Sequence, residues 1–372
     1  MTQQALKVAI VHDWLVGGGA ELVVEQLHQM FPEAPIYTSY ATPQWRKRLD
    51  GKVQAGWLQH LGFLRKYIPV LRIWWFTHLK FNGYDLVISS SGAEAKGVKV
   101  PKNTLHVNYC HAPTHYYWSR YEEYLAHPGF GPFDWLARLG LRLLVLPLRR
   151  WDRKAAQRPD VMVANSTHIQ QEIKKYYGRD STVVFPPVYL ERFSKPSNRN
   201  LKRHGLLISG RQTAYKRFDL AVAACTKLGL PLTVVGAGPD HARLRKLAGP
   251  SITFLGYTSD EVLEEELASA EGYIFPGLDD FGIAPVEALA SGTPVIAYKA
   301  GGALDYVIPG KTGEFFARSN TTSLAQTLAT FDPARYNPKD LRDKAATFSP
   351  AMFQTSMRAV LSTALAEHKA RS

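Results

Sequence analysis

The 372-residue chain has 45% hydrophobic and 21% charged residues, which is ordinary for a globular protein with large buried cores. Its length fits two α/β domains of about 170–200 residues better than one. The two cysteines, Cys110 and Cys225, are far apart and can build neither a disulfide framework nor a zinc site, so we expect a reducing, cytoplasmic location. No apolar run reaches the ~18–20 residues needed to cross a bilayer, and no signal peptide is visible.

The net charge of +13 is unevenly distributed along the chain. Residues 1–200 contain 26 Lys and Arg against 15 Asp and Glu, whereas residues 201–372 contain 19 against 17. A basic half beside a nearly neutral half indicates an anionic partner for the first half. Nucleic acid, an anionic membrane and a phosphorylated substrate all meet that description. The alternative is that the positive charge serves only to keep the protein soluble.

Strand-like runs alternate with helical patterns in both halves, which is typical of βαβ units and parallel sheets. The predicted strands of the first half are Lys7–His12, Ala34–Thr38, Leu86–Ser90, Thr104–Cys110, Val161–Asn165 and Ser181–Phe185, the last preceded by a helix over His168–Tyr177. Those of the second half are Gly205–Ser209, Leu232–Gly236, Ile252–Leu255, Gly272–Phe275 and Pro294–Tyr298. The helices predicted between them are Phe218–Leu228, Asp240–Leu247, Ser259–Ala270 and Pro285–Ala290.

The stretch from Pro186 to Asn200 is rich in Pro, Ser and Asn and predicts a linker between two similar α/β domains. We place the N-terminal domain at 1–190 and the C-terminal domain at 200–349. A final helix, about 350–372, follows the second domain, and we expect it to pack back on the first.

A glycine-rich loop, Gly17-Gly18-Gly19, separates the first strand from a helix and permits close approach of a ligand to the backbone. A Rossmann dinucleotide site is the obvious rival, but the run lacks the full G-x-G-x-x-G spacing, and no acidic residue follows the second strand in the right context. We therefore expect Gly17 and Gly18 to admit a diphosphate. Asp13, just before the loop, either orients an acceptor or caps a helix or turn.

His111 follows the strand Thr104–Cys110, so we expect it to point into a cleft between the domains. A lone His is more often structural, and position favours a functional role here. Two further stretches, Trp57–Phe81 and Trp135–Arg153, interleave aromatic, aliphatic and basic residues. On amphipathic helices these would seat the protein on an anionic bilayer. The alternative is buried helices whose basic side chains reach the surface.

In the second half, Arg211 and Lys216 follow a predicted strand in a loop that leads into a helix. Both can neutralise a diphosphate whose negative charge grows as a bond to it breaks, which stabilises the transition state without a metal. The alternative is a solvated basic loop.

Two carboxylates, Asp279 and Glu287, lie eight positions apart across a strand-to-helix turn. Ligands of open α/β sheets bind at this edge, a helix N-terminus there attracts phosphate, and ionised carboxylates accept hydrogen bonds from sugar hydroxyls. Phosphate with sugar hydroxyls indicates a nucleotide sugar. As a bland alternative, Glu287 is an acid that favours the helix dipole in the first turn.

The acidic-x7-Glu pattern and the Ala288–Ile296 run that follows it resemble the retaining nucleotide-sugar glycosyltransferases of the GT-B fold, family 4. The resemblance covers nearly the whole chain and implies an α/β fold of two facing Rossmann-like domains with the active site in the interdomain cleft. The Val107–Trp118 run is most similar to the bacterial branch that builds surface polysaccharides, often mannosyltransferases. One departure is Asp279, where the family usually has Glu.

The resemblance also implies roles for individual residues. Glu287 is expected to accept hydrogen bonds from the ribose, and Asp279 and His111 to contact the transferred sugar. The turn amides near Phe281, Gly282 and Ile283 would donate to the diphosphate or the sugar. Tyr257 is expected to line the pocket for the base.

The combined prediction is a retaining transferase that moves a hexose, mannose by family likeness, from a nucleoside diphosphate sugar such as GDP-mannose to a lipid-linked or glycan acceptor. It would need no metal or other cofactor, and would work peripherally on the inner face of the cytoplasmic membrane. The alternatives are an NAD-dependent oxidoreductase, whose fingerprint is incomplete, and a non-enzymatic nucleic-acid-binding protein, for which no motif appears.

Overall fold

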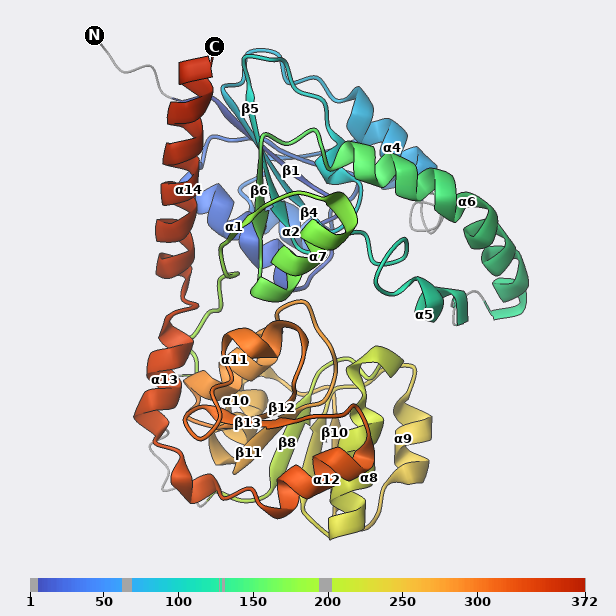
Figure 1. The fold of residues 1–372 in the computed structure, drawn as a ribbon, viewed down its shortest axis with the longest axis vertical. Helices are drawn as coiled ribbons and strands as arrows, with labels where there is room; N and C mark the ends of the chain where they lie inside the picture. Colours follow the sequence, from blue (N-terminus) through green and yellow to red (C-terminus); the bar gives the residue numbers. More distant parts are fainter. Residues whose placement is uncertain (1–5, 62–68, 127, 129–130, 194–202, 372) are drawn as a thin grey trace. The chain divides into compact units, whose positions relative to one another are not determined.

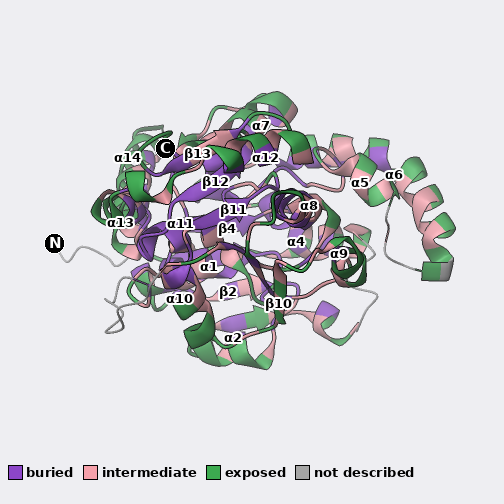
Figure 2. Ribbon diagram, turned by 90° about the horizontal axis from the view of Figure 1, so that it is seen from below, coloured by how far each residue is buried: buried purple, intermediate pink, exposed green. Residues whose placement is uncertain are grey.

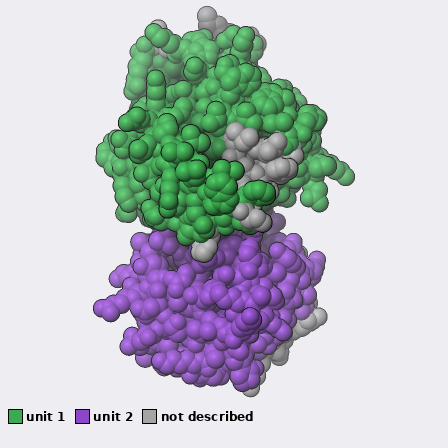
Figure 3. Space-filling model, turned by 90° about the vertical axis from the view of Figure 1, so that its right-hand side faces the viewer, with its two compact units in different colours: residues 1–186, 353–372 green, residues 187–352 purple. Residues whose placement is uncertain are grey.

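The computed structural model describes residues 6–61, 69–126, 128, 131–193 and 203–371. The chain divides into two compact units: unit 1 consists of residues 1–186 and 353–372, and unit 2 of residues 187–352 (Figures 1 and 3). Residues 194–202 of the predicted linker region lie outside the described residues, as do residues 62–68 of the first amphipathic stretch.

Among the described residues, unit 1 contains a parallel sheet of seven strands in the order β3-β2-β1-β4-β5-β6-β7 (Figure 1). The strands are β1 (Val8–His12), β2 (Ile36–Thr38), β3 (Val53–Ala55), β4 (Leu86–Ser91), β5 (Leu105–Cys110), β6 (Val161–Ala164) and β7 (Thr182–Val183). The central strands β1, β4 and β5 are buried along their whole length, as is typical of parallel sheets with helices on both faces. Figure 2 shows this burial at β4.

Helices connect the strands of unit 1 as the alternating pattern predicts. They are α1 (Gly19–Met30), α2 (Pro43–Arg48), α4 (Pro69–His78), α5 (Tyr121–Ala126), α6 (Asp134–Ala155) and α7 (Thr167–Tyr177), with 3-10 helices η1 (Trp57–His60), η2 (Ala95–Gly97) and η3 (Gly131–Phe133). Local signals set the bounds of α7, since the Ser166 side chain accepts from the Ile169 amide and Gly178 ends the helix in the left-handed region at φ 69°.

The last helix, α14 (Pro350–Arg371), packs into the core of unit 1 although unit 2 precedes it in the chain. Phe353, Met357, Leu361 and Ala364 recur at helical spacing and are buried in the same apolar cluster as β1 residues such as Ile10. The Phe353 ring also meets the Tyr109 ring edge-on, with 5.8 Å between centroids.

Unit 2 contains, within the described residues, a parallel sheet of six strands in the order β10-β9-β8-β11-β12-β13. Its strands are β8 (Leu206–Ser209), β9 (Leu232–Val235), β10 (Ile252–Gly256), β11 (Gly272–Phe275), β12 (Val295–Tyr298) and β13 (Gly313–Phe316). Its helices are α8 (Phe218–Leu228), α9 (His241–Leu247), α10 (Asp260–Ser269), α11 (Ile283–Ala290), α12 (Thr321–Ala329) and α13 (Pro338–Ala346), with 3-10 helices η4 (Ala214–Lys216), η5 (Gly301–Asp305) and η6 (Pro333–Arg335).

Three details differ from the predicted elements. The strands β3 and β13 were not predicted, since each is short and carries polar or glycine positions that weaken its apolar pattern. The predicted strand Ser181–Phe185 pairs only over Thr182–Val183. Helix α11 begins at Ile283, two residues before Pro285, so Glu287 is its fifth residue and does not lie in the first turn.

The strand order reverses direction at one place in each sheet, between β1 and β4 in unit 1 and between β8 and β11 in unit 2. Loops that leave the carboxyl ends of two such strands diverge to opposite faces of the sheet and create a crevice where ligands bind in open α/β sheets. The loops after β8 and β11 carry Lys216 and Asp279, so the topology alone brings these predicted residues to one place.

Candidate functional site

The loops that follow β8 and β11 lie directly against each other in unit 2. A Cβ atom on Gly277 would lie 2.9 Å from the Lys216 Cα and 3.0 Å from the Tyr215 carbonyl oxygen. Real Cβ atoms essentially never approach other heavy atoms that closely, so the contact requires glycine at this position. This backbone packing joins two chain segments that are about sixty residues apart.

A pocket opens where the two loops meet, and it encloses about 360 Å³, part of it open to solvent. Polar groups line it at Ser209, Lys216, Tyr273 and Asp279, together with the start of α11 at Gly282 and Ile283. Four of the predicted site residues therefore share one pocket.

Lys216 and Asp279 form an ion pair in this pocket, with 3.4 Å between the Lys Nζ and the Asp Oδ2. The two side chains are 26% and 15% exposed, so the pair is screened less than a surface pair and can still reach a ligand. A cation beside an acceptor-only carboxylate offers one group for a phosphate and one for a hydroxyl.

Two hydrogen bonds from the segment 302–306 hold the turn after Asp279. The Gly302 amide donates to the Asp279 carbonyl at 3.0 Å, and the Tyr306 hydroxyl donates to the Phe281 carbonyl at 3.0 Å. Gly282 adopts φ +91°, and a Cβ there would lie 2.7 Å from the Tyr306 hydroxyl oxygen. The turn thus holds one shape as it delivers the chain into α11.

The Phe281 side chain does not face the pocket, because its ring is buried against Tyr306 and Phe348. Any contribution of Phe281 to a ligand therefore comes from its backbone, and at the N-terminus of α11 the amides and the helix dipole favour an anion.

Glu287 is partly buried on α11 and is not among the residues that line the pocket. Burial raises the pKa of its carboxyl group to about 7, Asp260 adds to the rise, and Arg192 opposes it. In the described part of the chain the Glu287 carboxylate accepts no recorded hydrogen bond, so it is a titratable group without a fixed structural task. Its place in α11 removes the first-turn dipole explanation.

Arg211 and Tyr257 lie at the same edge of the sheet without entering the pocket. Arg211 is exposed on the loop after β8, and Tyr257, just past β10, is 80% exposed. Because β10 is separated from β8 by β9, the structure places Tyr257 away from Lys216 and Asp279.

In unit 1, the glycine-rich loop is held by a residue that the sequence did not single out. The Glu21 carboxylate accepts hydrogen bonds from the Val16 amide at 3.1 Å and the Gly17 amide at 2.9 Å. Gly17 has φ +120°, and Gly18 precedes the first residue of α1. The Gly17 amide is therefore engaged within the loop, while both glycines are exposed.

Asp13 is buried, and both of its carboxylate oxygens accept backbone hydrogen bonds from the segment after β4. The donors are the amides of Gly92, Ala93 and Ala95, at 2.8, 2.9 and 2.7 Å. Burial raises the pKa of the Asp13 carboxyl, and Glu94 raises it further. This geometry fits the turn-capping alternative, since both oxygens of Asp13 hold the loop after β4.

His111 lies just past the carboxyl end of β5 and is only partly buried. Its Nε2 lies 2.7 Å from the Ser90 Oγ, and its carbonyl oxygen accepts a hydrogen bond from the Asn165 side chain at 2.9 Å. The His12 ring stands edge-on to it, with 6.0 Å between centroids. The ring and the carbonyl of His111 are thus held at the edge of the sheet where ligands bind in such folds.

Sequence reasoning missed three groups that build or support the unit 2 pocket, namely Ser209, Tyr273 and Tyr306. Ser209 carried a usable signal, because it is a polar residue that ends an apolar strand. Tyr273 looked like an ordinary strand residue, although its hydroxyl lies 3.0 Å from the Ser209 Oγ. Tyr306 had no signal apart from the Gly301-Gly302 pair that precedes it.

Family models match both units of the chain. The model described as Glycosyltransferase Family 4 matches residues 17–192, and the model described as Glycosyl transferases group 1 matches residues 190–346. Together the two models cover residues from the glycine-rich loop to the end of α13.

Curated relatives match over part of the chain. A GDP-mannose-dependent alpha-mannosyltransferase of Mycolicibacterium smegmatis is 30% identical over 176 residues, which is 44% of this chain and 46% of the relative. A GDP-mannose-dependent alpha-(1-6)-phosphatidylinositol dimannoside mannosyltransferase of Mycobacterium tuberculosis is 33% identical over 166 residues, 42% of this chain and 43% of the relative. The chain thus spans somewhat less than half the length of these relatives.

Solved structures match along almost the whole chain. The Anabaena protein HepE, solved in complex with UDP, has a TM-score of 0.68 at 17% identity and covers 96% of this chain and 100% of its own. Sucrose-phosphate synthase of Thermosynechococcus elongatus has the same TM-score and identity over 97% of this chain and 100% of its own. With two Rossmann-like units, both family models and these neighbours, the chain belongs to the family 4 glycosyltransferases of the GT-B fold.

Proposed function

We propose that the protein transfers a hexose, mannose, from GDP-mannose to a lipid-linked or glycan acceptor in the biosynthesis of a surface polysaccharide, with retention of the anomeric configuration. Membership of the glycosyltransferase family supports the reaction class. The names of the two mannosyltransferase relatives support mannose and guanine. The structural neighbours at 17% identity support the fold alone.

One observation carries the proposal: a cation, a carboxylate and a helix N-terminus line a single pocket in unit 2. In the reaction, the bond between the sugar C1 and the diphosphate oxygen breaks, and the leaving diphosphate gains negative charge. The Lys216 ammonium and the backbone at Gly282 and Ile283 stabilise that charge where it develops. Arg211, exposed on the same loop as Lys216, adds a second cation.

The acceptor hydroxyl forms the new bond to C1 on the face that the diphosphate leaves, and its proton passes to the departing diphosphate. The two cations supply the positive charge that a divalent metal provides in other transferases, so we propose that turnover needs no metal and continues in EDTA.

The carboxylates have separate tasks in this proposal. Asp279 accepts from a hydroxyl of the transferred sugar, and its pairing with Lys216 fixes the direction of its short side chain. Glu287 accepts from the ribose hydroxyls, which requires its ionised form. In unit 1, we propose that His111 contacts the transferred sugar and that the glycine-rich loop with Gly17 and Gly18 admits a diphosphate.

We further propose that the protein works peripherally on the inner face of the cytoplasmic membrane. None of the described helices is both long and apolar enough to cross a bilayer. The basic half of the chain supports an anionic surface as its partner.

The test is transfer of label from a panel of radiolabelled nucleotide sugars into the lipid fraction of a membrane extract, in the presence of EDTA. We expect label from GDP-mannose in lipid. Glu287→Ala should abolish donor use, and Lys216→Ala should lower kcat by about 100-fold, the usual effect of removing one charge-stabilising group. Lys227→Ala changes an exposed lysine on α8 and serves as the matched control.

Three results would contradict the proposal. Wild-type turnover in both site variants would remove Lys216 and Glu287 from the site. Label transfer from another sugar nucleotide, but not from GDP-mannose, would refute mannose as the transferred sugar and would still support a glycosyltransferase. Tight, salt-sensitive nucleic-acid binding without any nucleotide-sugar binding would overturn the enzyme in favour of a nucleic-acid-binding protein.

A further inference from the structure

Helix α6 has two apolar faces, and the structure buries only one of them. The inner face consists of Val145, Leu148, Asp152 and Ala155, which recur every three or four residues and are buried. At about 100° per residue these positions occupy one narrow stripe along the helix. Whatever lies on the opposite side of α6 therefore faces away from the core.

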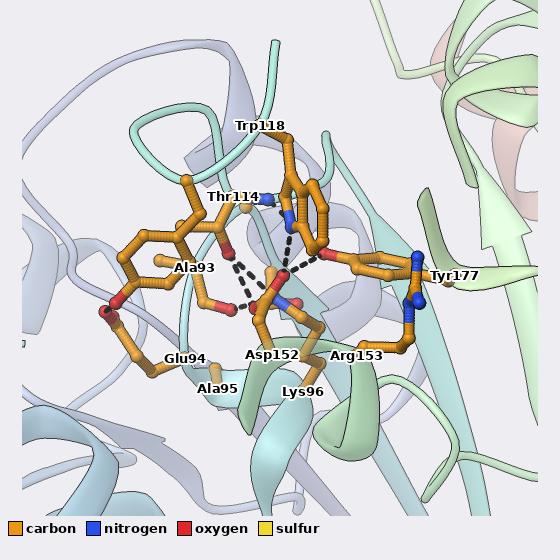
Figure 4. Close-up of polar contacts among 12 residues, drawn as sticks. Ala93, Glu94, Ala95, Lys96, Thr114, Trp118, Asp152, Arg153 and Tyr177 are labelled. Carbon is orange, nitrogen blue, oxygen red and sulfur yellow. Dashed lines mark hydrogen bonds and ion pairs between the residues drawn. The ribbon is translucent and has the colours of Figure 1, made fainter. Parts of the chain in front are cut away.

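A network of polar contacts fixes the rotation of α6 about its own axis (Figure 4). Asp152 is fully buried, and its Oδ1 lies 2.7 Å from the Lys96 Nζ of η2. Its carboxylate also accepts hydrogen bonds from Thr114 at 2.9 Å, Trp118 at 2.7 Å and Tyr177 at 2.7 Å. Rotating the helix to bury its outer face would break all four contacts.

The outer face presents an unbroken stripe of leucines. Leu136, Leu139, Leu143 and Leu146 are spaced by three, four and three residues and are 52%, 47%, 68% and 60% exposed. On a helical projection their stripe lies about 180° from the buried stripe. Single exposed leucines are unremarkable, but four aligned along three turns make a contiguous apolar surface that normally has a partner. We call these four residues the α6 stripe.

Basic residues border the α6 stripe. Arg150 continues it by one turn, and Arg142 lies on its flank; both are exposed. In the described ranges, the ion pairs recorded for α6 do not involve either of them. Trp135 and Phe133, 63% and 65% exposed, add large aromatic surface at the start of the helix.

We propose that the α6 stripe is the surface by which the protein docks on an anionic lipid bilayer, with α6 parallel to the membrane plane. Leucines enter the boundary between head groups and acyl chains, and Arg142 and Arg150 meet lipid phosphates. A second copy of the chain fits less well, because pairing two stripes would bring their arginines together. The inference rests on the proposed location at a membrane, and it is independent of the sugar that is transferred.

The test compares binding of the full chain to vesicles of phosphatidylcholine with and without phosphatidylglycerol, measured by cosedimentation. We expect binding to the anionic vesicles that weakens as salt rises. The double variant Leu139→Glu/Leu143→Glu should bind at least about tenfold more weakly, since it places two charges in the lipid contact. Leu247→Glu/Val262→Glu adds the same charge at exposed apolar positions of unit 2 and should bind as the wild type does.

Other outcomes overturn the inference in distinguishable ways. Equal binding by the wild type and the α6 variant would show that the α6 stripe is not the docking surface, while the membrane location would still be supported. No binding by the wild type would refute both the docking surface and the membrane location. Donor turnover measured on a soluble acceptor would still test the proposed function. A wild-type dimer that becomes a monomer in the α6 variant, with vesicle binding unchanged, would identify the stripe as a self-association surface.

Discussion

The Asp152 network allows a quantitative prediction about the stability of unit 1. Replacing Asp152 by Ala leaves the buried Lys96 ammonium without its counter-ion, although Asp152 now holds the pKa of that lysine above its ordinary value against the opposing effect of burial. It also removes the acceptor for Trp118 and Tyr177. Breaking a buried pair costs about 3–5 kcal/mol, so we expect a loss of about 4 kcal/mol in the free energy of unfolding.

A loss of this size is a large share of the ~5–15 kcal/mol by which native proteins are stable. For a unit of about 200 residues it corresponds to a fall in Tm of roughly 8–16 °C. All eight tryptophans of the chain lie in unit 1, so their fluorescence during urea unfolding reports this unit without a contribution from unit 2.

The exposed pair of Lys174 and Asp180 in the same unit supplies the control. Its charged atoms are 2.8 Å apart, against 2.7 Å for Lys96 and Asp152, but the side chains are 60% and 92% exposed, so Asp180→Ala should cost less than about 0.5 kcal/mol. In the double variant Lys96→Ala/Asp152→Ala the two losses should overlap by about 2 kcal/mol, because no lone charge remains buried. Strictly additive losses, or equal effects at Asp152 and Asp180, would refute the reasoning.

Four further predictions concern unit 2 and the terminal helix. Glu287→Gln should raise the free energy of unfolding of unit 2 at pH 8 and barely change it at pH 5. The folded-state pKa of about 7 lies above the ordinary 4.5, so the stability that the protonated carboxyl contributes is lost as pH rises through 7. Urea unfolding followed by circular dichroism at both pH values measures the difference. Because the ribose role requires the ionised carboxylate of Glu287, GDP-mannose binding by the wild type should strengthen between pH 6 and pH 8. A flat affinity profile in titration calorimetry would contradict that role. Tyr306→Phe removes the hydroxyl that holds the Phe281 carbonyl and should weaken donor binding several-fold while secondary structure is kept; unchanged affinity by titration calorimetry would show that the turn needs no such support. Leu361→Ala opens a cavity where α14 meets the unit 1 core and should lower the free energy of unfolding by about 2–4 kcal/mol, whereas Met352→Ala at an exposed position of the same helix should change it little.

The sequence predicted the alternating strands and helices because predominantly apolar strands such as β1 and β11 stand out between glycine and proline signals. It failed at β3 and β13, where three or four residues with glycine or a polar side chain carry too little pattern. It also placed the start of α11 at Pro285, since proline favours a first turn, although the helix begins at Ile283.

The candidate site was predictable to the extent that topology decides it. Lys216 and Asp279 meet because each follows a strand at the switch point, which strand order alone implies. The task of Asp13 was not predictable, since its partners are backbone amides about eighty residues away. The burial of Lys96 and Asp152 was equally hidden, because a charged residue in a sequence gives no sign of a distant partner.

The position of α14 has a consequence for synthesis. Its residues Phe353 to Ala364 belong to the core of unit 1, yet they are translated after all of unit 2. On the ribosome, unit 2 can fold as soon as residue 352 has emerged. Unit 1 cannot complete its core until α14 follows, so the apolar surface that α14 covers stays exposed. The N-terminal half is thus the later of the two to finish folding, and during that interval its exposed apolar surface is open to aggregation.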